Sequence, residues 1–286
     1  MTTLGSMFPH GVIVRGLTLG LALAACWSGC ATAGMITFEA NGNTPADITA
    51  TRDAFRSAVG GGTTSGPNGN FGGVRREINW DGVPDGFSDP NSLPGNFFNV
   101  NSPRGVVFST PGTGFLVSAN AGGATPALFG FGGDLQAFSA QRLFASAGSN
   151  VTDILFFLPG TTTAATTSAF GAIFVDVETS GETKMEFFDG NNALIYSREV
   201  LAGANQGLSF TGGVASAGER IARVRITTAD NVLISNGLRA NEITDFVVMD
   251  DFLYATPQSA VPEPGTAWLL GIGLAAGGVA RLRKRR

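Results

Sequence analysis

Residues 221–227 are Ile-Ala-Arg-Val-Arg-Ile-Thr, and this alternation decides the fold class. In an extended chain, Ala222, Val224 and Ile226 lie on one side and the polar residues between them lie on the other. Such a period of two is typical of an antiparallel strand with one face in a core and the other in water. The stretch therefore predicts a half-exposed antiparallel β-strand.

The central part of the chain, residues 34–257, has a composition that is typical of short strands joined by turns. The sequence contains 41 glycines, which together with Thr, Ser and Asn favour turns. Asp-Gly-Asn-Asn at 189–192 separates two strand-like stretches and predicts a hairpin. We predict an all-β fold for residues 34–257, an antiparallel β-sandwich of jelly-roll type. Further strands are expected at 35–39, 75–80, 105–109, 114–118, 151–158, 170–178, 183–188, 193–200 and 244–254.

One helix is expected at residues 45–59. Ile48, Phe55 and Val59 share a face at helical spacing, and three consecutive glycines from Gly60 would end the helix. The Gly-rich residues 60–73 then predict a mobile loop.

The N-terminus has the features of a secretory signal peptide over residues 1–33. Arg15 precedes an apolar run at 17–25, and Ala-Thr-Ala at 31–33 predicts cleavage by signal peptidase after Ala33. A second interpretation stays open. Leu-Ala-Ala-Cys at 23–26 also fits a lipoprotein box, which would place a lipid on Cys26.

The C-terminus, residues 258–286, has the features of a membrane address. Prolines in Val261-Pro262-Glu263-Pro264 prevent a helix from starting before residue 265. The apolar run 265–282 has 18 residues, and as a helix it would span roughly 27 Å, close to the thickness of a hydrocarbon core. A basic cluster follows and predicts a cytoplasmic end with the body outside. It consists of Arg281, Arg283, Lys284, Arg285 and Arg286.

These three parts, in this order, closely resemble the PEP-CTERM sorting signal of exported bacterial proteins. The resemblance implies recognition through Val261–Pro264, cleavage near that motif by an exosortase, and an inner-membrane intermediate held by residues 265–282. It further implies a Gram-negative host, a final place at the cell surface or in the extracellular matrix, and an association with exopolysaccharide or biofilm. The alternative interpretation is a plain tail anchor that is never cut.

Processing at both ends changes the chemistry of the chain. Both cysteines and the single histidine precede Ala33, so the processed chain has neither residue type. This excludes a Ser-His-Asp triad, a Cys nucleophile and the usual zinc sites. Residues 34–261 carry 21 acidic and 12 basic side chains, a net charge of −9, which argues against nucleic acid as a partner. We therefore predict a protein that is not an enzyme.

Catalysis by Asp and Glu carboxylates is the enzymatic mechanism that the composition of the processed chain does not exclude. A glycoside hydrolase needs only two carboxylates, and Asp81, Asp85 and Asp89 are the candidates in a turn-rich loop. Residues of this kind more commonly cap turns. A polysaccharide hydrolase is accordingly the less favoured alternative function.

A structural calcium ion is a further use for acidic groups, and it is the only cofactor that the sequence suggests. In a jelly roll the first and last strands often lie side by side, which would bring Glu39 toward Asp250 and Asp251 as oxygen ligands. The alternative is that the adjacent aspartates pair with an arginine, such as Arg223 or Arg225, or with solvent.

The favoured function is an exported, non-catalytic surface or matrix protein. A glycan-binding β-sandwich module is the main alternative. It would need an exposed aromatic platform, for which Trp80, supported by Phe87 and by Phe97 and Phe98, is the candidate.

Overall fold

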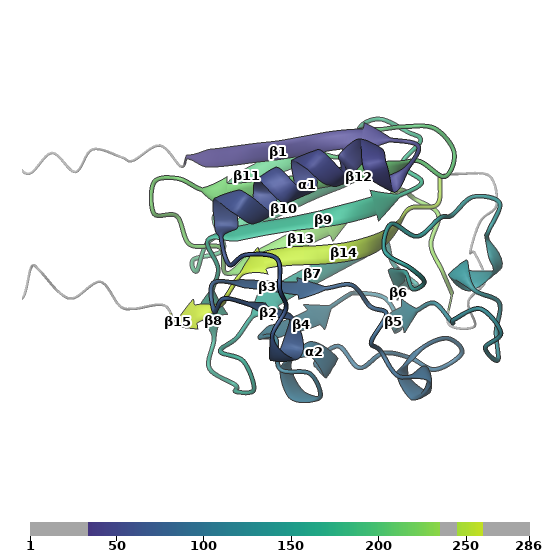
Figure 1. The fold of residues 1–286 in the computed structure, drawn as a ribbon, viewed down its shortest axis with the longest axis horizontal. Helices are drawn as coiled ribbons and strands as arrows, with labels where there is room; N and C mark the ends of the chain where they lie inside the picture. Colours follow the sequence, from purple (N-terminus) through teal and green to yellow (C-terminus); the bar gives the residue numbers. More distant parts are fainter. Residues whose placement is uncertain (1–33, 235–244, 260–286) are drawn as a thin grey trace, which may run out of the picture. The chain divides into compact units, whose positions relative to one another are not determined.

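The computed structural model describes residues 34–234 and 245–259, which form two packed antiparallel sheets and a covering helix (Figure 1). The predicted signal peptide and the sorting tail from residue 260 lie outside the described residues. The all-β, sandwich-like fold class predicted from the sequence is confirmed.

The larger sheet has eight strands. Its main path runs β1-β12-β9-β14-β3-β2, with β6 pairing with β14 and β5 pairing with β6. All of these pairings are antiparallel, and β1 and β12 pair along their whole length. The strands are β1 (Met35–Gly42), β2 (Asn70–Phe71), β3 (Arg75–Ile78), β5 (Gly114–Val117), β6 (Phe144–Ala147), β9 (Ala169–Val175), β12 (Leu208–Ala215) and β14 (Val248–Ala255).

The smaller sheet has five strands in the order β11-β10-β13-β7-β4. Its strands are β4 (Val106–Ser109), β7 (Val151–Phe156), β10 (Lys184–Phe188), β11 (Leu194–Glu199) and β13 (Arg223–Thr227). The strand β13 is the alternating stretch that predicted the fold class, and it buries Val224 and Ile226 while its arginines stay partly exposed. The predicted hairpin is confirmed, because Asp189 closes the turn between β10 and β11 by accepting a hydrogen bond from Ala193 N at 2.8 Å.

Short elements complete the described chain. A separate two-stranded sheet pairs β8 (Ala165–Thr166) with β15 (Gln258–Ser259). The short helices are η1 (Pro67–Gly69), η2 (Asp85–Phe87), α2 (Phe97–Val100) and η3 (Leu128–Gly130). The Gly-rich stretch predicted as a mobile loop therefore contains η1 and β2.

Apolar side chains fill two layers, one on each face of the larger sheet. Between the sheets, Phe170 and Phe174 of β9 pack with Phe187 and Val224 of the smaller sheet. On the opposite face, Ile173 and its neighbours pack beneath the helix. All seven residues of β9 are consequently buried, which explains their continuous apolar sequence.

The helix α1 (Pro45–Val59) lies across the outer face of the larger sheet (Figure 1) and has the bounds predicted from the sequence. It begins at Pro45 after the N-cap residue Thr44, and the Asp47 carboxylate in its first turn accepts a hydrogen bond from Thr44 N at 2.8 Å. Ile48 and Phe55 are fully buried beneath it. A helix covering one sheet face explains why that face is apolar.

The sequence did not predict β12. Its centre is Gly212-Gly213, a pair that normally favours a turn. Here both glycines allow close packing: a Cβ on Gly212 would lie 2.8 Å from the ring of Phe55, and one on Gly213 would lie 2.8 Å from the ring of Phe187. The strand is therefore glycine-rich because aromatic rings cover both of its faces.

We predict that Gly212→Ala lowers the free energy of unfolding by about 1–3 kcal/mol, because the added methyl overpacks the buried ring of Phe55. Denaturant unfolding monitored by circular dichroism measures this change. Gly190→Ala is the control, since a Cβ there meets nothing within 4 Å. Equal stability of the two variants would contradict the packing described for β12.

Candidate functional site

The predicted calcium site is not formed. The strands β1 and β14 are separated by β12 and β9, so Glu39 and the adjacent aspartates of β14 lie on non-neighbouring strands. Glu39 instead forms a salt bridge with Arg198, at 2.7 Å between Oε1 and Nε. The jelly-roll expectation that the first and last strands are neighbours was wrong, because β12 and β9 insert between them.

Asp250 and Asp251 are both buried where β14 meets the 138–139 segment. Asp250 Oδ2 accepts hydrogen bonds from the backbone N–H groups of Phe138 at 2.7 Å and Ser139 at 3.2 Å. The Ser139 hydroxyl lies 2.9 Å from Asp251 Oδ1 and 3.1 Å from Asp250 Oδ1. Burial raises the pKa of both carboxyls, and the charge of Asp251 raises the pKa of Asp250 further.

Arg223 and Arg225 do not contact this aspartate pair. Both arginines bind Asp153 on the neighbouring strand β7, at 2.8 Å and 2.7 Å. The ion pairing proposed for the two aspartates as an alternative to calcium is therefore also wrong. Hydrogen bonds from the 138–139 segment hold the pair instead.

Trp80 is not available as a glycan platform, which corrects the prediction from sequence. Its side chain is 1% exposed, and its indole stacks on Phe144 with ring centroids 4.1 Å apart. Its Nε1 donates a hydrogen bond to Asp250 O at 2.6 Å. Phe97 and Phe98 are buried as well, so the loop aromatics contribute to the core.

The aspartates of the turn-rich loop stabilise that loop. Asp81 Oδ1 accepts hydrogen bonds from the backbone N–H groups of Gln141 and Arg142, and Asp85 forms a salt bridge with Arg142. The backbone N–H of Asp89 donates to Val117 O at 2.7 Å. The side chains of Asp81 and Asp85 thus connect this loop to the 141–142 segment, whereas their turn-rich setting predicted that they cap turns within the loop.

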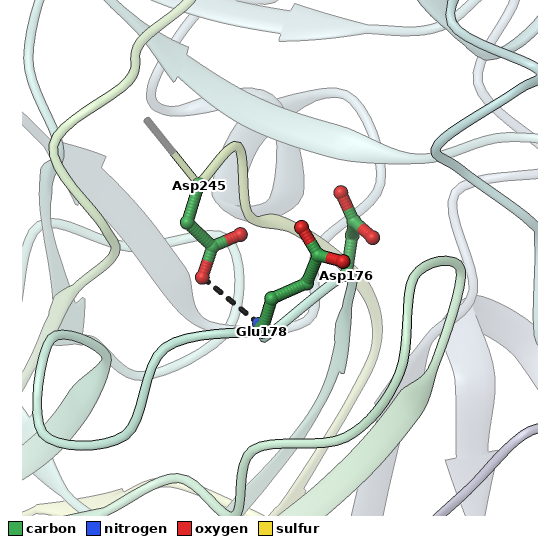
Figure 2. A group of neighbouring side chains, drawn as sticks. All are labelled: Asp176, Glu178 and Asp245. Carbon is green, nitrogen blue, oxygen red and sulfur yellow. Dashed lines mark hydrogen bonds between the residues drawn. The ribbon is translucent and has the colours of Figure 1, made fainter. Parts of the chain in front are cut away.

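Among residues 34–234 and 245–259, one group of three acidic side chains has the spacing for a metal ion. Figure 2 shows Asp176, Glu178 and Asp245, whose carboxylate oxygens lie within 4.8 Å of one another. Asp245 Oδ2 also accepts hydrogen bonds from the backbone N–H groups of Glu178 at 2.9 Å and Thr179 at 3.0 Å. The carboxylates can supply hard oxygen ligands, and they also connect the end of β9 to the 245–247 segment.

The charge of this group has a measurable consequence at Asp176. Burial, together with the nearby charges of Glu178 and Asp245, raises the pKa of the Asp176 carboxyl to about 7. One hydrogen bond, from Gln206 N at 2.8 Å, acts in the opposite direction. Asp176 therefore takes up a proton on folding throughout the mildly acidic range.

A larger site lies beside α1, and the sequence did not predict it. A cleft of about 760 Å³ opens between α1, the 63–71 segment, β3, β14 and the 138–139 segment. We call it the α1 cleft. Its charged lining residues are Arg52, Arg56, Arg75, Glu77, Arg104 and Asp251.

Two of the arginines in the α1 cleft share one carboxylate. Arg56 Nη2 lies 2.6 Å from Glu77 Oε2, and Arg75 Nε lies 2.7 Å from Glu77 Oε1. Arg75, which is fully buried, also donates hydrogen bonds to Gly60 O and to Gly62 O. The ion pairs hold the helix against β3, and the hydrogen bonds of Arg75 hold the Gly-rich stretch. Arg52 and Arg56, one turn apart on α1, are the sequence signal for a basic helix face.

The described residues therefore define a helix-covered β-sandwich with an arginine-lined cleft. The family model of the PEP-CTERM protein-sorting motif matches residues 260–286, and the chain thus ends in a PEP-CTERM sorting motif, as the resemblance implied. That motif marks the chain as an exported protein that crosses a membrane and is sorted to the cell surface, with an exosortase as its processing enzyme.

The search of curated proteins found no match. In the part of the chain that the structure describes, no helix is both long and apolar enough to span a membrane. The sorting residues Val261–Pro264, the predicted membrane helix 265–282 and the basic residues from Arg281 to Arg286 all lie outside that part.

We predict that Asp176→Asn removes a pH-dependent loss of stability. The folded-state pKa of about 7 is above the unfolded value, so the folded protein binds the additional proton between about pH 4 and 7. Stability from this proton is fully present near pH 4 and is lost as the pH rises through 7. The variant should therefore be more stable than the unmodified chain at pH 8, by roughly 1–3 kcal/mol.

The measurement is the difference between the two unfolding free energies from pH 4 to pH 8. Asparagine suits the positive φ of 68° at this position, so the substitution adds little backbone strain. Asp230→Asn, at an exposed carboxylate, is the control. A difference that does not change with pH would contradict the protonation assigned to Asp176.

Proposed function

We propose that the chain is a non-catalytic surface or extracellular-matrix protein of a Gram-negative bacterium, associated with exopolysaccharide. The observation that carries this proposal is the sorting motif at residues 260–286. The secretory features of residues 1–33 support it from the other end of the chain, because an exosortase substrate must first be exported.

The chemistry of the processed chain supports a role without catalysis. Removal of residues 1–33 takes away every cysteine and histidine, which are the usual nucleophile and general base. Of the carboxylates considered for hydrolysis, Asp81 and Asp85 bind the 141–142 segment. A reducing-end assay on acidic and neutral polysaccharides tests this part of the proposal, and release of sugar would contradict it.

We predict that replacing Pro262, Glu263 and Pro264 together by alanine blocks sorting. The helix-breaking prolines and the acidic residue separate the body from the membrane segment, so their loss removes the expected recognition element. The variant should stay in the membrane fraction with residues 265–286 attached. The unmodified protein should reach the cell surface without them. Intact mass and terminal peptides from the native host measure both results.

Gln258→Ala is the matched control, because Gln258 is exposed and precedes the motif. It should be processed as the unmodified chain is. Two results would contradict the proposal: normal trimming of the triple-alanine variant, or an unmodified protein that keeps residues 265–286. A lipid on Cys26 would make the chain a lipoprotein and overturn cleavage after Ala33.

A further inference from the structure

We propose that the α1 cleft binds a carboxylate-bearing saccharide, such as a uronic acid unit of an extracellular polysaccharide. This deepens the proposed function and depends on it for the setting in which such a polymer is present. The inference is based on the size of the cleft, its charge, and the side chains on its walls.

The size of the cleft suits a small ligand or a short stretch of polymer. At about 760 Å³ it falls within the range of roughly 300–1,000 Å³ that is common for ligand pockets. Its walls come from segments distant in sequence, and the ion pair between Glu77 and Arg56 connects two of them, β3 and α1. The cleft is therefore preformed, which lowers the entropic cost of binding.

The cleft is a basic site on an acidic body. Four arginines line it against two carboxylates, Glu77 and Asp251, whereas residues 34–261 have a net charge of −9. Glu77 already binds Arg56 and Arg75. The positive charge of the cleft attracts an anionic polymer, and the negative charge on the rest of the body disfavours its binding elsewhere.

Arg104 is the arginine of the cleft that has no carboxylate partner among the described residues. Its Nε is also buried without a hydrogen-bond partner in that part of the chain. Its Nη1 donates to the Ser102 hydroxyl at 2.8 Å, and its guanidinium lies 5.0 Å from the ring centroid of Phe98. A planar guanidinium fixed on an aromatic ring is well oriented to bind a carboxylate through two hydrogen bonds.

Arg52 adds a second cation from the helix. Its own partner, Asp53, is half exposed to solvent, whereas the Arg52 side chain is 13% exposed, so a ligand carboxylate would replace Asp53 at a largely buried guanidinium. The guanidinium of Arg52 also lies over the ring of Phe138, 4.9 Å from its centroid. Arg52 and Arg104 therefore present two oriented donors from different walls of the cleft.

The remaining lining favours a hydroxylated ligand. Hydroxyl and amide groups line the cleft together with the arginines, and they can both donate to and accept from sugar hydroxyls. Arg75 lies over the ring of Phe71 and Arg52 lies over the ring of Phe138, and the exposed lining of the cleft is more polar than apolar. The polar members of the wall are Thr49, Thr63, Ser65, Asn68, Asn79 and Ser139.

The test is calorimetric titration of the exported protein with trigalacturonic acid, and with galactotriose as the neutral comparison. We expect binding of the acidic trisaccharide only, weakened by 0.5 M salt. Arg104→Gln and Arg52→Gln should each raise Kd about tenfold or more, since each removes a charge-assisted contact. Arg104→Lys, which keeps the charge but not the fork of donors, should give an intermediate Kd.

Arg198→Gln is the matched control, because this exposed arginine pairs with Glu39 on β1 and does not line the cleft. Melting temperatures of all variants establish that they fold. The inference would be overturned if trigalacturonic acid did not bind, or if galactotriose or dextran sulfate bound equally well. It would also be overturned if both Arg104→Gln and Arg52→Gln left the Kd unchanged. If the binding test fails but the tail is trimmed normally, the inference is wrong and the proposed function stands. If the tail is not trimmed, the proposed function is wrong, and the binding test still decides the inference.

Discussion

The buried side chain of Arg75 is the constraint on which the arrangement of this domain depends. It is 1% exposed, and it donates to Glu77 Oε1, to Gly62 O and to two carbonyls at the C-terminal end of α1. A cation suits that position, because unpaired carbonyls make the end of a helix negative. A buried charge is stable only when it is fully paired. Because Arg75 lies on β3, its partners at the end of α1 and in the Gly-rich stretch must lie next to β3.

The same ion network connects the fold to the proposed binding site. Glu77 binds two arginines, which leaves the α1 cleft with an excess of cationic groups. Asp251, which lines the cleft, lies beside Asp250, and burial raises the pKa of both carboxyls. The cleft is thus basic even though the domain is acidic.

Local sequence patterns predicted the elements whose signal lies in neighbouring residues. The strand β13, the hairpin at Asp189 and the helix α1 follow from alternation, turn chemistry and helical spacing. Features that depend on contacts between distant residues were missed or predicted wrongly. Gly212 and Gly213 favour a turn by local sequence, but the rings of Phe55 and Phe187 pack against them in a strand. Trp80 was predicted to be exposed, but it stacks on Phe144 in the core. The α1 cleft combines residues from positions 45 to 251, which no local pattern connects.

Hydrogen exchange of the α1 amides in Glu77→Gln tests the central claim most directly. This substitution keeps the shape of the side chain but leaves Arg75 buried without its counter-charge, which should cost about 3–5 kcal/mol. The account predicts that α1 amides lose protection while those at the centre of the larger sheet, in β9 and β12, keep more of theirs. Unchanged protection of α1 would show that the helix is held by its apolar face alone, and that would contradict the role given to Arg75 and Glu77.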